Sequence, residues 1–170
     1  MRRFLVLLIV LVTVFACKPR RINIEDIIAE LEYDKFQTIV LEILNERHNF
    51  AAIPFITYVM MGMDHDRFYE RYFLWALLDD IDSNLSIHHS ISHPYAFTFD
   101  RETGELVRYF YPDGTFFEIG EIQDNFPERI IRQFLHISQE EHINRVDSMR
   151  ETNIWNAKVH FGLEIGAGGW

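Results

Sequence analysis

Three histidines lie close together in this chain of 170 residues. His88, His89 and His93 follow shortly after an acidic run at residues 79–82. Imidazole and carboxylate groups are the ligands that zinc and related metals prefer, and a catalytic zinc uses three protein ligands plus water. The segment therefore indicates a metal-binding or metal-dependent hydrolytic site at the three histidines. Because Pro94 and several serines predict an irregular segment, a solvated polar loop is the simpler interpretation.

Other chemical patterns are incomplete. The sequence Asp80-x-Asp82-x-Asn84 resembles the start of a calcium-binding loop. Leu85 and Ile91 occupy the positions where that loop requires glycine and glutamate. The chain also lacks a Gly-x-Ser-x-Gly motif, a phosphate-binding glycine loop and a His-Glu-x-x-His motif. We therefore expect no catalytic residues and no cofactor, and we expect a non-enzymatic role.

Cys17 is the only cysteine, and it directly follows an apolar segment. Arg2 and Arg3 precede a nearly unbroken apolar run from Phe4 to Ala16. A helix needs about 20 apolar residues to cross a bilayer, so this run is too short. It fits the apolar region of a secretory signal peptide, but the small residue at its end stands before cysteine.

The sequence Val14-Phe15-Ala16-Cys17 is similar to the lipobox of bacterial lipoproteins. The resemblance implies that residues 1–16 are removed as a signal peptide. It also implies that Cys17 is the site of lipid attachment, acylated on its thiol and on the new amino terminus. Each buried methylene contributes about 0.8 kcal/mol, so two or three acyl chains anchor a protein stably. Residues 17–22 would then form a short tether between the membrane and the folded domain.

The same resemblance implies a location in the bacterial cell envelope, facing the periplasm or the exterior. Lys18 stands where an aspartate often signals retention at the inner membrane, which favours the outer membrane. The first expected partner is the membrane, through lipidated Cys17, and the second is another envelope protein. Acylation of Cys17 leaves no thiol for a disulfide or a nucleophile in the mature domain.

The charge of the chain excludes some classes of partner. The sequence has 16 basic and 26 acidic residues, a formal charge of −10. Loss of the two arginines of the signal peptide leaves 14 basic residues against the same 26, a formal charge of −12. Such a surface repels nucleic acid, which we therefore do not expect as a partner. Residues 23–170 are long enough for one domain with its own core.

Two helices are predicted at the start of this domain. Asn23 can cap a helix over residues 24–31, where isoleucines and a leucine recur at helical spacing. Asp34 and Gln37 form the pattern of a capping box for a second helix, whose apolar stripe covers residues 36–44.

Two more helices are expected after them. Pro54 suits the first turn of a helix that continues to Met61 and stops at Gly62. A fourth helix is predicted to begin at Asp64 or Asp66 and to continue through Leu78. Because this segment is apolar over most of its circumference, it should be the central and most buried helix.

Residues 83–94 are expected to be a connector, after which the apolar period changes from helical to alternating. Strands are predicted over residues 95–100, 105–111 and 115–120. The turn signal Pro112-Asp113-Gly114 separates the last two of these strands. The three strands would form an antiparallel meander.

The remaining residues predict helices followed by a strand. Pro127 should begin one helix, and Ser138 with Glu141 forms a capping box for another. Residues 155–165 alternate between apolar and polar, which predicts a C-terminal strand. The predicted fold class is thus α+β, with N-terminal helices, a three-stranded antiparallel meander, one or two further helices and a final strand. The helices should cover one face of the small sheet.

Overall fold

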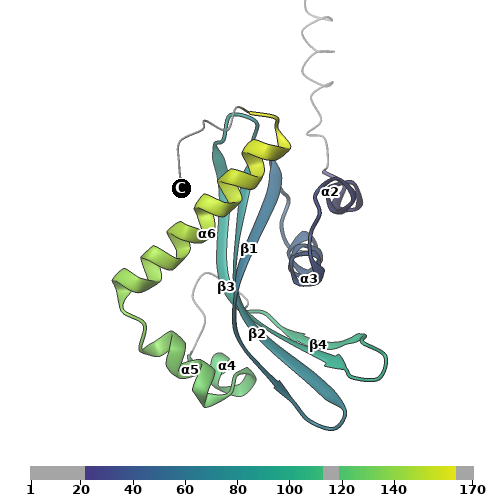
Figure 1. The fold of residues 1–170 in the computed structure, drawn as a ribbon, viewed down its shortest axis with the longest axis vertical. Coiled ribbons are helices and arrows are strands. Elements are labelled where there is room, and N and C mark those ends of the chain that lie inside the picture. The colour runs from purple at the N-terminus through teal and green to yellow at the C-terminus, as the bar shows by residue number, and fades with distance from the viewer. Residues whose placement is uncertain (1–21, 113–118, 164–170) are drawn as a thin grey trace, which may run out of the picture.

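Helices flank a four-stranded antiparallel sheet in the computed structural model, which describes residues 22–112 and 119–163 (Figure 1). The first helices are α2 (Ile24–Glu30) and α3 (Lys35–Asn45). The strands are β1 (Ile53–His65), β2 (Tyr69–Ile81), β3 (Ile87–Asp100) and β4 (Leu106–Phe110). The last helices are α4 (Ile119–Asn125), α5 (Glu128–Leu135) and α6 (Gln139–His160). The predicted α+β class is confirmed.

The two N-terminal helices begin where local capping signals predicted. The Asn23 side chain accepts a hydrogen bond from the Glu25 amide at 3.4 Å. Asp34 Oδ1 accepts from the amides of Phe36 and Gln37, both at 2.9 Å. Gln37 Oε1 in turn accepts from the Asp34 amide at 3.0 Å, which completes the capping box. These bonds satisfy amides that the first helical turn leaves without partners.

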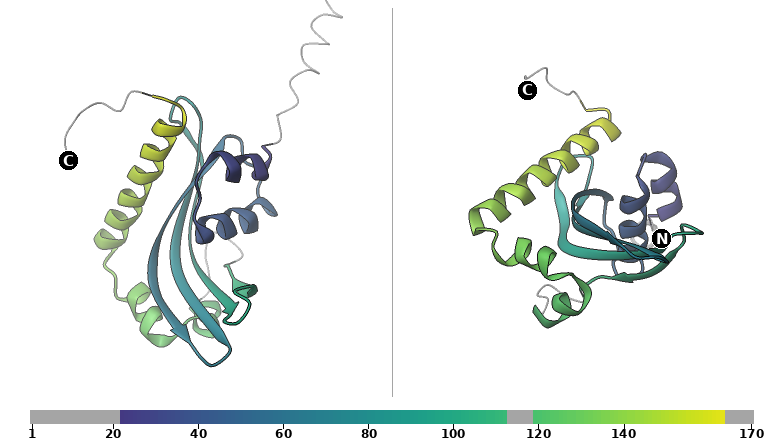
Figure 2. Two further views of the ribbon diagram at one scale, coloured as in Figure 1. Left: turned by 45° about the vertical axis from the view of Figure 1, so that its right-hand side comes forward. Right: turned by 60° about the horizontal axis from the view of Figure 1, so that its bottom comes forward.

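The sheet is a simple meander in the order β1-β2-β3-β4. Helices α2 and α3 lie on one of its faces, and α6 crosses the other face (Figure 2). The sequence predicted helices on one face only, and the structure corrects this to a helix–sheet–helix arrangement. Strand β2 lies in the middle of this arrangement, so both of its faces are covered.

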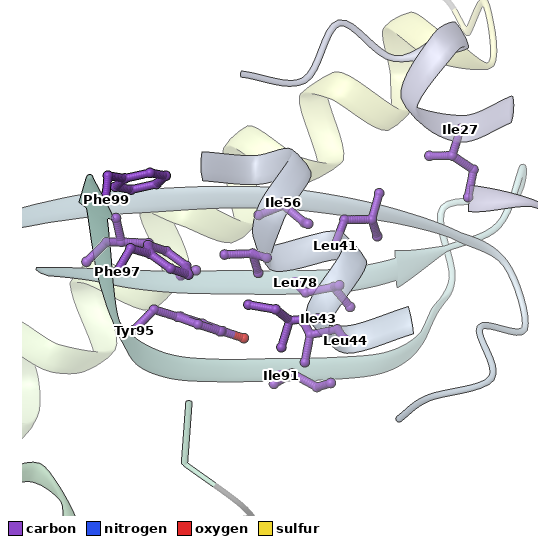
Figure 3. Close-up of a cluster of buried hydrophobic side chains, with 13 residues drawn as sticks. Ile27, Leu41, Ile43, Leu44, Ile56, Leu78, Ile91, Tyr95, Phe97 and Phe99 are labelled. Carbon is purple, nitrogen blue, oxygen red and sulfur yellow. The ribbon is translucent and has the colours of Figure 1, made fainter. Parts of the chain in front are cut away.

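One apolar core lies between the sheet and the helices α2 and α3. Tyr95, Phe97 and Phe99 alternate along β3, so their side chains point to the same face and pack beneath α3 (Figure 3). They meet an aliphatic layer from the helices and from β1 and β2 that consists of Ile27, Val40, Leu41, Ile43, Leu44, Ile56, Leu74, Ala76 and Leu78.

A second core lies on the opposite face. Phe73, Trp75 and Leu77 of β2 point toward helices α4, α5 and α6. The helices contribute Ile122, Ile130, Ile131 and Met149, and Phe126 adds its ring from the turn between α4 and α5. The predicted helix starts at Pro127 and Ser138 are confirmed, because both residues are N-caps of the helices that follow.

The predictions of helices over residues 54–61 and 64–78 were wrong, because these segments form β1 and β2. A strand that is buried on both faces is apolar on both, so it loses the alternation that identifies a half-buried strand. Gly62 does not end a helix. It lies at a bulge in β1, where the register with β2 shifts between Met60 and Gly62.

The prediction of a connector over residues 83–94 was also wrong, because β3 already begins at Ile87. Pro94 is tolerated in this strand because β4 pairs only with residues 96–99 of β3. The missing amide of Pro94 therefore costs no bond to β4. The predicted meander strand over 105–111 corresponds to β4, whereas the predicted strand over 115–120 falls largely outside the described residues, and Ile119 already belongs to α4.

The predicted C-terminal strand over residues 155–165 was wrong. Residues 155–160 are the last turns of α6, and residues 164 and 165 lie outside the described part of the chain. The side chains buried by α6 are Met149, Asn153 and Ala157, at the i, i+4 spacing of a helix face. The alternation of apolar residues at its end does not reflect burial, since Val159 is 54% exposed.

Side chains from α3, from α5 and from the loop between α2 and α3 donate hydrogen bonds to backbone carbonyls of the edge strand β1. Tyr33 donates to the carbonyl of Pro54, Gln37 to that of Ile56, Gln133 to that of Met61 and Arg129 to that of Met63. An unprotected edge strand of this length would be a template for pairing with another chain. These side chains thus occupy several of the β1 carbonyls that an added strand would use.

Candidate functional site

The structure places the three predicted metal ligands in different surroundings. The Nε2 atom of His88, at the start of β3, lies 3.0 Å from a carboxylate oxygen of Asp82, which lies in the turn between β2 and β3. The register between β2 and β3 skips His88, because Ile87 and His89 are the residues that pair. His89 and His93 share the sheet face that α2 and α3 cover, but they are four residues apart on an extended strand.

A fourth histidine, which the sequence did not single out, lies next to one of these. The ring centroids of His48 and His89 are 5.5 Å apart. His93 is buried and packs edge-on against Tyr111, with 5.6 Å between the ring centroids. Among residues 22–112 and 119–163, no group of three His, Cys, Asp or Glu side chains could hold a metal ion. The metal site at His88, His89 and His93 stays a hypothesis that this arrangement does not favour.

One cleft lies beside α4, at the end of the sheet that carries the β1–β2 hairpin. Its volume is about 360 Å³. Four polar side chains form a row across it because the register pairs Asp64 with Arg71, Arg71 with Thr98 and Thr98 with Arg108. Neighbouring strands are about 4.8 Å apart, so the backbones of the two arginines are about 10 Å apart. All four strands therefore position this row.

Both arginines in the cleft are held by neighbours. Arg71 Nη2 lies 2.9 Å from Asp66 Oδ2, and Arg108 Nη2 donates to Asn125 Oδ1 of α4 at 3.1 Å. Backbone hydrogen bonds from Phe68 and the residue after it lower the pKa of Asp66, and the charge of Arg71 adds to this effect. Asp66 is therefore ionised at neutral pH and keeps Arg71 in place.

The cleft also has aromatic side chains in its lining, which are Phe73, Phe110 and Phe126. Phe97 and Tyr109 pair with each other and place their side chains on the opposite face of the sheet. Guanidinium groups bind carboxylates through paired hydrogen bonds, and aromatic rings provide flat apolar surface. The cleft is thus suited to a ligand that combines acidic and apolar groups.

A separate polar network holds α6 on the sheet. Asp79 is fully buried, and its carboxylate accepts from Ser90 at 2.6 Å and from Asn153 of α6 at 3.0 Å. Thr57 donates to Asn153 Oδ1 at 2.6 Å, and Arg150 lies 3.6 Å from Asp79. These groups satisfy one another, so the network fixes the position of α6 and does not form a reactive site.

Comparison with known proteins found no match to a family model, to a curated protein or to a solved structure. No helix within the described residues has the length and apolar character needed to span a membrane. Cys17, the predicted site of lipid attachment, lies outside the described residues.

Proposed function

We propose that this chain is a lipid-anchored protein of the bacterial cell envelope that binds another envelope protein through the cleft between the sheet and α4. The role is non-enzymatic. The observation that carries the binding function is the row of polar side chains across four strands, with Arg71 and Arg108 above an aromatic lining. The proposed ligand is an extended polypeptide segment with acidic side chains next to aromatic or aliphatic ones.

The anchor is supported by the signal sequence and its lipobox-like end at Cys17. Helix α2 begins at Ile24, and a chain of six residues spans at most about 20 Å. The domain would therefore stay close to the membrane, with α2 as its nearest element. The cleft lies at the end of the sheet that carries the β1–β2 hairpin. This end is at the opposite end of the molecule from α2 (Figure 1). This orientation would present the cleft to partners away from the bilayer.

In-cell photocrosslinking would test the proposed partner. A photoreactive amino acid at Thr98, which lies between Arg71 and Arg108 in the row, should capture a partner in the envelope fraction. The same group at Ile143, which is exposed on α6, serves as the control position. The double variant Arg71→Ala, Arg108→Ala should abolish capture at Thr98.

A matched variant controls for loss of surface charge. Arg132 is an exposed arginine of α5 that pairs with Glu128 in the same helix. Arg132→Ala should leave the crosslink at Thr98 unchanged, and it should leave the affinity of the purified partner unchanged as well. Equal capture at Thr98 and Ile143, or capture that does not depend on Arg71 and Arg108, would rule out the cleft as the binding site.

A further inference from the structure

The loop after α3 and the first half of β3 bring two imidazole rings together. The ring centroids of His48 and His89 are 5.5 Å apart, and the ring planes differ by 39°. Imidazole nitrogens bind zinc at about 2.0–2.1 Å in tetrahedral geometry, which places the centroids of two rings on one zinc roughly 5 Å apart. The separation of the two ring centroids is therefore close to that of two imidazoles on one metal ion.

We propose that His48 and His89 bind one divalent transition metal of the zinc, copper or nickel type. These metals prefer imidazole ligands. Because the described residues contain no group of three suitable side chains, water completes the coordination shell. This site differs from the one that the sequence predicted, since it uses His48 in place of His88 and His93.

Rigid elements hold both ligands. The amide of His48 donates to the Leu44 carbonyl at 2.9 Å, which fixes His48 to the end of α3. Asp80 pairs with His89 in the sheet, and its carboxylate accepts from the amides of Ala51 and Ala52, both at 2.8 Å. The loop that carries His48 is therefore tied to the strand position next to His89, and the fold preorganises the pair.

A positive charge lies next to the pair, because Arg47 directly precedes His48. Arg47 lies over the Tyr111 ring, with its guanidinium carbon 5.0 Å from the ring centroid. Its positive charge opposes a cation and limits the affinity.

Calorimetric titration of the untagged full-length protein in detergent with ZnCl₂ or NiCl₂ at pH 7.5 tests the proposal. The wild-type protein should bind one metal ion per chain. Loss of a group that merely supports a ligand lowers metal affinity by about 10- to 100-fold, so His48→Ala and His89→Ala should each weaken binding by at least about tenfold. His88→Ala, one residue from His89, and His93→Ala should bind like the wild type.

Circular dichroism would establish that each variant is folded. The metal should also raise the melting temperature of the wild-type protein and of His88→Ala, but not that of His48→Ala or His89→Ala. Absence of binding to the wild type would overturn the proposal, as would unchanged affinity in His48→Ala or His89→Ala. A loss of affinity in His88→Ala or His93→Ala equal to that in His89→Ala would assign the metal to other ligands.

Discussion

Replacement of Asp80 by alanine should be among the most damaging single changes to this fold. The Asp80 side chain is 1% exposed, and its two carboxylate oxygens accept from the amides of Ala51 and Ala52. A buried amide left without a partner costs about 1–3 kcal/mol. Ala52 is buried and bears this cost in full, whereas exposed Ala51 recovers part of it from water. We therefore expect the free energy of unfolding to fall by about 3 kcal/mol, a large share of the 5–15 kcal/mol typical of a domain.

Asp82→Ala is the matched control for this prediction. Asp82 also accepts from two backbone amides, those of Asn84 and Ser86, at 2.8 and 2.9 Å. These amides lie in an exposed turn, where water can replace the lost acceptor. Urea denaturation followed by circular dichroism should therefore show a much smaller loss for Asp82→Ala. Equal losses in the two variants, or a loss under about 1 kcal/mol for Asp80→Ala, would refute the assigned role of burial.

Three further predictions concern the histidines, the β1 bulge and the β1 edge. Burial lowers the pKa of His93, with a smaller effect of His48, so the unfolded chain binds more protons below pH about 6.5. The free energy of unfolding should therefore fall between pH 7 and 5.5. His93→Gln should reduce this dependence on pH in urea denaturation at several pH values, and an unchanged dependence would contradict the prediction. A Cβ atom at Gly62 would lie 2.7 Å from Ile130 Cδ1, so Gly62→Ala should cost about 1–2 kcal/mol. Ile130→Val should recover part of this loss in a double-mutant cycle, and strict additivity would exclude the clash. Gln37→Ala removes a bond of the α3 capping box, so it should lower the melting temperature. It also removes a side chain from the β1 edge, so it should promote self-association that light scattering detects. A variant that stays monomeric with an unchanged melting temperature would exclude both roles.

Local signals in the sequence predicted where helices begin. The caps at Asn23, Asp34 and Ser138 act on amides two or three residues away, so the sequence contains the whole interaction. The same holds for Pro127 at the start of α5. Predictions that depended on a few neighbouring residues were therefore confirmed.

Patterns that depend on distant segments were misinterpreted. Strand β2 has helices on both faces, and this burial removes the alternation that marks a strand. The end of α6 alternates by chance, although its buried face follows helical spacing through Asn153 and Ala157. In both cases the packing partner, which the local sequence does not contain, decided the structure.

The candidate sites were hidden for the same reason. His48 and His89 meet only because α3 ends beside β3. Arg71 and Arg108 face one cleft only because the register of three neighbouring strands aligns them. Residue types alone pointed to His88, His89 and His93, and the fold separates His88 from the other two.

Intact-mass measurement of the protein extracted from bacterial membranes tests the proposed lipid anchor most directly. We predict a polypeptide that begins at Cys17 and carries the added mass of two or three acyl chains. Cys17→Ser should remove the added mass and release the protein from the membrane fraction. An unmodified wild-type polypeptide that retains residues 1–16 would contradict the proposal.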